Sequence, residues 1–307
     1  MSRPPPPLMS MLRLVARGVR ARGATPALDV TSPRRKAACE RAEIRVDPAR
    51  VRAYAGATGG ETIGAFFDAR PVAPPFFCAT WETALALEMF AALETPLPLG
   101  AMVHVSTEMV WARALPPDEP IRCRVELDRV ERTPRGWRLT VLSRNWMGAG
   151  QLCCQGTSVF MVRTPAPGDG ASAHPPRAAE PPADDRGAWT ELARWPLAAG
   201  AGRRYARVSG DYNPIHLWPW TARPFGFRAP ILHGYATAAR AAHALIGQRL
   251  HGDPAALRRM RIAFRAPLPL PSTAVLLVDD AAPEHRFRVA ADDGATVYAE
   301  GAYGGIA

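Results

Sequence analysis

Hydrophobic and polar positions alternate along several stretches of the chain in a way that predicts β-strands. The clearest case is residues 121–127, where Ile, Cys, Val and Leu alternate with two arginines and a glutamate. Successive side chains of a strand point to opposite faces, so this pattern gives one apolar and one charged face. Strands are predicted at Val103–Trp111, Ile121–Leu127, Arg138–Arg144, Cys153–Val162, Arg261–Arg265, Ala274–Val278, Arg286–Ala290 and Thr296–Ala299.

Two other stretches have the spacing of a helix. In the first, Thr80–Glu94, four apolar residues fall on one face: Leu85, Met89, Phe90 and Leu93. The second covers about 234–250, and each helix precedes a run of predicted strands. Because the strands follow one another without crossover helices, we expect an α+β fold, in which an antiparallel sheet wraps around a central helix.

This order of one helix and several strands occurs twice along the chain. Tyr54-Ala55 corresponds to Tyr205-Ala206 at an offset of 151 residues, and Arg113-Ala114 corresponds to Arg265-Ala266 at 152. Two matches at nearly one offset, within the same order of elements, predict an internal duplication. The two units are expected to pair their sheets within one chain.

Composition sets the expected domain boundaries. Residues 1–38 form a basic arm with a helical spacing of apolar residues, which predicts either a mobile arm or a segment for membrane-surface or organellar targeting. Residues 39–164 form the first unit and residues 189–307 the second. Residues 165–188 are rich in proline with little to bury, as is typical of a linker.

Charge and cysteine content narrow the classes of function. The chain has 38 basic and 28 acidic residues, a formal net charge of +10, but Lys36 is its single lysine. A P-loop or Schiff-base lysine is therefore excluded beyond that position, and scattered arginines without a recognition motif argue against nucleic-acid binding. The five cysteines form no C-x-x-C pair, which argues against a metal site and favours a reducing, cytoplasmic location. No apolar run is long enough to cross a bilayer.

Residues 205–237 concentrate polar side chains among glycines, prolines and aromatics. Asp211, Asn213 and His216 lie within six residues, and a proline restricts the backbone between them. A carboxylate beside an imidazole is suited to proton transfer, because proximity tunes both acidities. Gly234 begins the second predicted helix, where free N–H groups favour negative charge and a glycine leaves room for a carbonyl oxygen. The segment therefore predicts an acid–base site beside an oxyanion-binding amide.

Structural interpretations of the same residues remain open. Asp211 and Asn213 are also typical of Asx turns and helix caps. His216 is also typical of a buried core histidine, and Gly234 of a packing glycine. His104 lies in an alternating strand and is predicted to be structural.

The segment resembles the motif of the MaoC-like (R)-specific enoyl thioester hydratases and dehydratases, the hydratase-2 group of the hotdog superfamily. The matching residues are Tyr205-Ala206, Ser209-Gly210-Asp211, Asn213-Pro214-Ile215-His216, Ala222, Gly226-Phe227, Pro230-Ile231 and His233-Gly234. The chain as a whole is similar to double-hotdog members, in which two hotdog units are fused and one keeps the catalytic motif.

By position, the resemblance implies that Asp211 and His216 are the acid–base pair. It implies that Asn213 is an orienting hydrogen-bonding residue and that the Gly234 N–H binds the thioester oxygen. Many relatives have Asp two residues after the motif histidine, where this chain has Trp218. Further candidates for substrate contacts are Trp218, Trp220, Phe227, His233, Arg223 and Arg228.

The repeat offset gives an internal control. Subtracting 151 places Gly60 opposite Asp211 and Ala65 opposite His216. The first unit therefore lacks the acid–base pair, and we expect it to be a structural or acyl-binding partner.

The expected function is a hydro-lyase that reversibly hydrates trans-2-enoyl thioesters and dehydrates (3R)-hydroxyacyl thioesters in fatty acid metabolism. The carrier is CoA or acyl carrier protein, and no metal or organic cofactor is required. The alternatives are a non-catalytic protein that binds acyl thioesters or scaffolds a partner, and a hotdog thioesterase. A serine hydrolase is disfavoured, because Ser209 has no G-x-S-x-G elbow. The assembly is an internal pseudo-dimer or a further homodimer of it.

Overall fold

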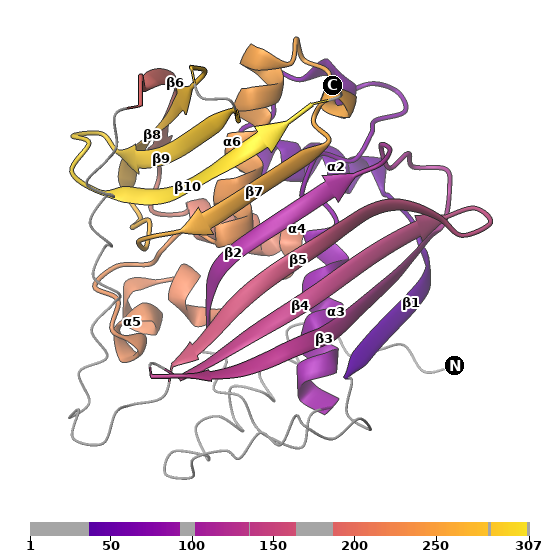
Figure 1. Ribbon diagram of the computed structural model, residues 1–307, viewed down its shortest axis with the longest axis horizontal. Coiled ribbons are helices and arrows are strands. Elements are labelled where there is room, and N and C mark those ends of the chain that lie inside the picture. The colour runs from indigo at the N-terminus through magenta and orange to yellow at the C-terminus, as the bar shows by residue number, and fades with distance from the viewer. Residues whose placement is uncertain (1–36, 93–101, 135, 164–186, 282–283, 306–307) are drawn as a thin grey trace.

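The computed structural model describes residues 37–92, 102–134, 136–163, 187–281 and 284–305. Within them, a single ten-stranded antiparallel sheet has the order β1-β3-β4-β5-β2-β7-β10-β9-β8-β6 (Figure 1). The strands are β1 (Ala38–Ile44), β2 (Met102–Trp111), β3 (Ile121–Thr133), β4 (Gly136–Met147), β5 (Gln151–Arg163), β6 (Thr190–Leu197), β7 (Arg259–Phe264), β8 (Ser272–Asp279), β9 (Arg286–Ala291) and β10 (Val297–Gly304).

The two halves of the sheet repeat one topology. The first half has the order β1-β3-β4-β5-β2 and the second, read from its outer edge, β6-β8-β9-β10-β7. Strands β2 and β7 join the halves by pairing antiparallel, with Ser106 opposite Ala263 and Val110 opposite Arg259. This confirms the expected α+β double hotdog, in which two duplicated units share one continuous sheet.

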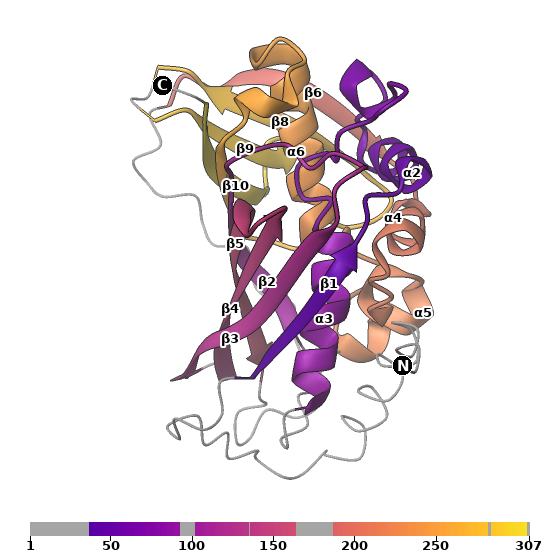
Figure 2. The same ribbon diagram turned by 90° about the vertical axis from the view of Figure 1, so that its right-hand side faces the viewer.

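The helices all lie on one side of the sheet, with α3 and α6 next to it and α2 and α4 farther out (Figure 2). The α-helices are α2 (Pro48–Thr58), α3 (Ala79–Ala92), α4 (Ala201–Ser209), α5 (Pro219–Ala222) and α6 (Gly234–Arg249), and short 3₁₀ turns are η1 (Gly64–Phe66), η3 (Pro214–His216), η4 (Arg223–Phe225) and η5 (Pro254–Ala256). Most of the buried residues of α6 are alanines, which let the sheet and neighbouring helices approach closely. No helix in the described part of the chain combines the length and apolar character of a membrane span.

The repeat predicted from sequence is visible in α2 and α4, which contact each other. Their tyrosines Tyr54 and Tyr205 are both buried, with ring centroids 5.9 Å apart. Both helices end at a glycine in the left-handed region, Gly59 with φ 76° and Gly210 with φ 79°. Glycine takes this conformation without the penalty a Cβ would impose, so the chain can turn sharply at the same point after each helix.

All predicted strands overlap observed strands, and both predicted helices are confirmed within one to two residues in their described parts. Strands β1 and β6 were missed because they form the two sheet edges, where exposure blurs the apolar pattern. Helix α2 was missed although its signals are present: Asp47 caps it, a proline follows, and Val51, Tyr54 and Thr58 are its buried face. The predicted arm and linker lie outside the described residues, apart from positions 37–38 and 187–188.

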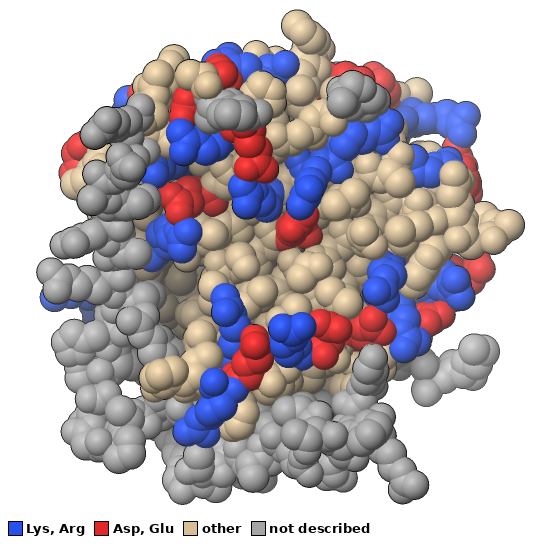
Figure 3. All heavy atoms as spheres, in the orientation of Figure 1, with Lys and Arg blue, Asp and Glu red and all other residues tan. Residues whose placement is uncertain are grey.

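On the outer face of the sheet, basic and acidic side chains lie next to each other in groups, and an uncharged area separates these groups (Figure 3). Glu126 lies 2.8 Å from Arg144 and 3.1 Å from Arg124, and Arg259 lies 2.7 Å from Glu108. The arginines on this face therefore alternate with acidic side chains. They do not form the basic stripe typical of nucleic-acid binding.

Candidate active site

The loop after α4 holds Asp211 and Asn213 by local hydrogen bonds. One carboxylate oxygen of Asp211 accepts from the Asn213 backbone N–H at 3.1 Å. The side-chain oxygen of Asn213 accepts from the Ile215 N–H at 3.4 Å and so caps η3. The turn and cap interpretations are thus correct for both residues. They do not compete with a chemical role, because the second carboxylate oxygen and the Asn213 amide nitrogen keep their hydrogen-bonding capacity.

His216 is the last residue of η3 and is fixed by its backbone surroundings. Its Nδ1 lies 2.8 Å from the carbonyl oxygen of Ile231. A carbonyl only accepts, so Nδ1 carries the proton and Nε2 is left as an acceptor. On its other side, η3 packs closely on α4 at Gly202, where a Cβ would overlap the carbonyl oxygen of His216. Gly202 therefore permits the approach that places the imidazole.

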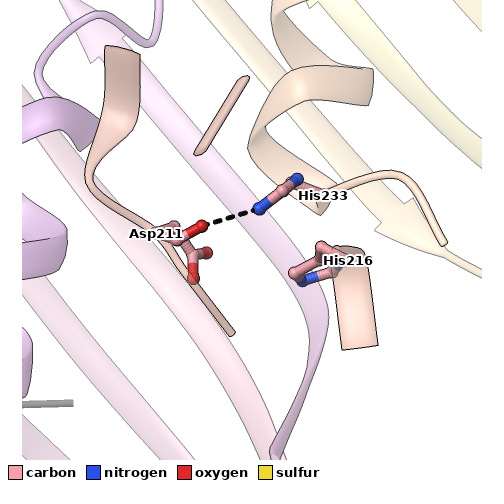
Figure 4. Close-up of side chains that lie close together, drawn as sticks. All are labelled: Asp211, His216 and His233. Carbon is pink, nitrogen blue, oxygen red and sulfur yellow. Dashed lines mark hydrogen bonds between the residues drawn. The ribbon is translucent and has the colours of Figure 1, made fainter. Parts of the chain in front are cut away.

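His233, directly before α6, completes the cluster. Its Nε2 donates to the carbonyl oxygen of Asp211 at 3.0 Å (Figure 4). Its Nδ1 is buried and has no hydrogen-bond partner among the described residues. The rings of His216 and His233 stack with centroids 3.7 Å apart. One carboxylate oxygen of Asp211 and one ring nitrogen of each histidine all lie within 4.8 Å of one another.

Burial sets the protonation of the two histidines. It lowers the pKa of His216, and the nearby negative charge of Asp211 opposes that shift. It holds the pKa of His233 well below the ordinary value, and the adjacent His216 lowers it further. Both imidazoles are therefore neutral at neutral pH, and the pair has one free basic nitrogen on each ring.

Gly234 is the first residue of α6 and lines the same cavity as Asp211 and His216. The first N–H groups of a helix have no acceptor one turn earlier, so its amide is available to a ligand. A Cβ here would lie 2.8 Å from Nδ1 of His104 and 3.0 Å from the ring of Phe264. Both interpretations therefore fit Gly234. A side chain at this position would collide with its neighbours, and without a side chain the amide N–H stays uncovered.

The cavity has a volume of about 370 Å³ and is lined by both halves of the chain. The second half contributes Asp211, His216 and Gly234, and the first half contributes α3 and the inner face of β2, β4 and β5. The first half therefore forms one wall of the cavity.

The candidate substrate contacts divide into two groups. Phe227 is buried and lines the cavity together with Asn213 and His233. Trp218 and Trp220 instead stack on each other at the surface, with 40% and 68% of their area exposed, and they do not belong to the described cavity lining. Arg223 and Arg228 are also exposed and outside that lining. The structure does not bring these four residues to the acid–base pair.

Sequence reasoning missed His104, which we expected to be only structural. It lines the cavity, and its ring lies 4.7 Å from those of Phe160 and Tyr235. Burial lowers its pKa to about 4, and its Nε2 has no hydrogen-bond partner in the described part of the chain. No motif could have identified it, because it comes from the half that lacks the acid–base pair.

Asp211, His216 and His233 are also close enough to ligate one metal ion. His216 Nδ1 and His233 Nε2 are each hydrogen-bonded to a backbone carbonyl, so each ring would offer only its other nitrogen to an ion.

Comparisons with known proteins agree with this geometry. Residues 192–295 match the family model described as MaoC like domain. The 3-hydroxyacyl-thioester dehydratase X of Mycobacterium tuberculosis is 29% identical over 277 residues, which cover 89% of either protein. The peroxisomal enoyl-CoA hydratase 2 of Arabidopsis thaliana is 45% identical over 58 residues, 19% of either protein.

A crystal structure of HtdX from Mycobacterium tuberculosis superimposes with a TM-score of 0.69 and 21% identity, covering 88% of this chain and all of that one (100%). At this identity the likeness concerns the fold, which extends over both halves. Together with the strand order and the matched residues, it identifies the architecture. Residues 192–295 match a MaoC-like domain, and the described residues of the two halves together have the double-hotdog fold.

Proposed function

We propose that the protein is a hydro-lyase that reversibly hydrates trans-2-enoyl thioesters and dehydrates (3R)-hydroxyacyl thioesters. The observation that carries this proposal is the close approach of a carboxylate oxygen of Asp211 and a ring nitrogen of His216, within 4.8 Å, in one cavity at the start of α6. The relatives named as a 3-hydroxyacyl-thioester dehydratase and an enoyl-CoA hydratase support the same reaction class.

The two side chains divide the proton transfers. In hydration, they bind one water and remove its proton as the oxygen bonds to C3 of the enoyl group. The π electrons of C2=C3 shift toward the thioester oxygen, where the Gly234 N–H stabilises the negative charge. C2 then takes a proton from the pair, which restores both side chains. The Asn213 amide, on the same cavity wall, orients the hydroxyl or water by hydrogen bonding.

The direct test uses the purified protein with crotonyl-CoA and a longer trans-2-enoyl-CoA, followed by the loss of enoyl absorbance. Asp211→Asn and His216→Ala are each expected to lower kcat by roughly 10²–10⁴-fold, the usual contribution of a positioned acid or base. Absence of turnover on every chain length, or full activity in both variants, would overturn the proposal. Thiol release, measured with a disulfide reagent, would instead indicate a thioesterase.

The finer assignments are also proposals. The carrier is CoA or acyl carrier protein. The five cysteines are all free thiols, which supports a reducing compartment such as the cytoplasm.

Contact of residues 1–38 with a membrane surface is tested by liposome co-sedimentation before and after deletion of that arm, and unchanged binding would contradict it. A further homodimer is tested by light scattering of the purified chain.

A further inference from the structure

Two indoles stack on each other at the surface of the second half, outside the described cavity lining. Trp218 directly precedes α5 and Trp220 lies within it, with ring centroids 5.7 Å apart and 17° between the ring planes. The guanidinium of Arg203 lies over the Trp218 ring, 5.6 Å from its centroid. Trp220 is 68% exposed, and among the described residues only Trp218 stacks on its ring. The stack therefore ends in an open aromatic face.

Hydrogen bonds to the surrounding backbone hold this stack in place. Arg203 Nη1 donates to the carbonyl oxygen of Leu217 at 2.8 Å, which ties α4 to the loop before α5. The Thr221 hydroxyl donates to the carbonyl oxygen of Pro214 at 2.7 Å and accepts from the Trp218 N–H at 3.1 Å. The indoles are thus ordered before a ligand binds, which reduces the entropy lost when a planar ring stacks on them.

The arginines next to the stack have no acidic partner. Residues 201–250 contain seven arginines and one acidic residue, Asp211, which lines the cavity. Arg223 follows Trp220 by three positions in the consecutive helical turns α5 and η4, so their side chains are neighbours at the surface. In the part of the chain that the structure describes, neither Arg203 nor Arg223 forms an ion pair, in contrast to the arginines of the outer sheet face.

The segment that carries the indoles forms part of the cavity wall on its other side. Ala222, at the end of α5, packs with Ile215 and Phe227, and both of these line the cavity, which is partly open to solvent. In CoA the pantetheine arm separates the thioester from the adenine nucleotide. A subsite for the nucleotide must therefore lie outside the cavity that binds the acyl group, as these exposed indoles do.

We propose that this surface binds the adenine nucleotide of a CoA thioester. The subsite consists of the two stacked indoles and the arginines beside them, namely Trp218, Trp220, Arg203 and Arg223. The adenine ring stacks on the open face of Trp220, and the two guanidinium groups bind phosphate oxygens. The inference rests on the proposed function, which places the thioester in the adjacent cavity, and it selects CoA over acyl carrier protein as the carrier.

The chemistry of the surface favours a nucleotide over other occupants. A purine has a flat aromatic face, and a guanidinium group matches the oxygens of a phosphate with paired N–H donors. An acidic helix of a carrier protein would pair with the arginines, but its carboxylates would not stack on an indole. A hydrocarbon chain would cover the indole, but it would leave both guanidinium groups without an anion. A phosphorylated purine satisfies both kinds of group at once.

The test compares crotonyl-CoA with crotonyl-pantetheine, which has the same acyl group and arm but no nucleotide. We expect the wild-type protein to favour crotonyl-CoA in kcat/KM by roughly tenfold or more, mainly through KM. Trp220→Ala removes the stacking face and should lower this ratio by about fivefold or more. Trp220→Phe keeps an aromatic face and should retain part of the ratio. Arg223→Gln removes a phosphate contact and should also lower it.

The control variant is Trp146→Ala on β4. The guanidinium of Arg122 lies over the Trp146 ring, 4.7 Å from its centroid, so this variant also removes the tryptophan of a tryptophan–arginine pair. Trp146 is outside the described cavity lining, and its replacement should leave the ratio of the two substrates unchanged.

The ratio separates this inference from the proposed function. If both substrates are turned over equally well, or if Trp220→Ala and wild type show the same ratio, the subsite is wrong and the hydro-lyase proposal stands. If Trp220→Ala and Arg223→Gln impair only the turnover of crotonyl-acyl carrier protein, the surface contacts a carrier protein and the nucleotide assignment is also wrong.

If no enoyl thioester is turned over, calorimetry with CoA and with pantetheine still decides. Tighter binding of CoA than of pantetheine by wild type, weakened about fivefold or more in Trp220→Ala, supports the subsite. Equal binding of the two ligands, no binding of CoA, or equal binding of CoA by wild type and Trp220→Ala overturns it.

Discussion

The imidazole of His216 stacks on that of His233, with ring centroids 3.7 Å apart and 25° between their planes. Each ring donates one N–H to a backbone carbonyl, His216 to Ile231 and His233 to Asp211. The loop that carries the carboxylate and the two turns that carry the imidazoles are therefore tied together. Two stacked imidazolium ions would repel each other, so this arrangement favours neutral rings.

The first prediction concerns the pKa of His216. Burial lowers it, so the acidic limb of the pH–rate profile should lie below about 6.5, the ordinary value for histidine. The charge of Asp211 opposes this shift, and Asp211→Asn should therefore lower the pKa of His216 further. Nuclear magnetic resonance titration of the histidine Cε1 protons measures both. A pKa of His216 that rises in Asp211→Asn would contradict the assignment.

The second prediction concerns the hydrogen bond from His233 to the Asp211 carbonyl. His233→Phe keeps an aromatic ring to stack on His216 but loses the N–H donor. Loss of a hydrogen bond worth about 1 kcal/mol should lower kcat/KM by roughly fivefold to tenfold. His285→Phe replaces an exposed histidine and is the control. Equal activity in the two variants would show that the hydrogen bond does not position the carboxylate.

The third prediction compares two glycines of α6. Gly234→Ala puts a Cβ 2.8 Å from His104 and 3.0 Å from Phe264, so we expect roughly 1–3 kcal/mol of destabilisation and reduced activity. Gly247→Ala meets nothing within 4 Å and should stabilise the protein by about 0.5–1 kcal/mol through its helix propensity. Urea unfolding measures both free energies. Similar effects at the two positions would argue against close packing at Gly234.

The fourth prediction concerns stability in acid. The pKa of His104 is about 4 in the folded protein, whereas the unfolded chain has the ordinary histidine value of 6.5. As pH falls, the unfolded chain therefore takes up the proton first. The stability present above pH 6.5 should fall between pH 6.5 and 4 by about 3 kcal/mol from this residue. His104→Phe, which preserves the aromatic contacts, should make the free energy of unfolding less dependent on pH in that range. An unchanged slope in urea unfolding at pH 7, 6, 5 and 4.5 would contradict this.

The sequence established more of the second half, which carries the proposed acid–base pair, than of the first half. Asp211, Asn213, His216 and Gly234 are close along the chain, and local turns and a helix start bring them together, so their spacing predicts the cluster. The surface position of Trp218 was not predictable, because an aromatic residue near a motif fits a channel wall and a surface equally well until the packing is known.

Residues contributed by the first half could not be assigned to the site from sequence. Glu82 and His104 are more than 100 positions from Asp211, and only the β2–β7 pairing and the packing of α3 on the sheet bring them to the same cavity. A glutamate in an apolar helix and a histidine in a strand have no local pattern that indicates a ligand.

The amino-acid sequence by itself determined the alternating strands, the central helices, the duplication and the acid–base motif, because each depends on neighbours within one element or one turn. The tertiary structure alone decided which residues of the first half face the motif, which aromatics remain at the surface, and how the two histidine rings stack. Those relationships depend on how the two half-sheets join and close over one cavity, and no short stretch of sequence encodes contacts across that distance.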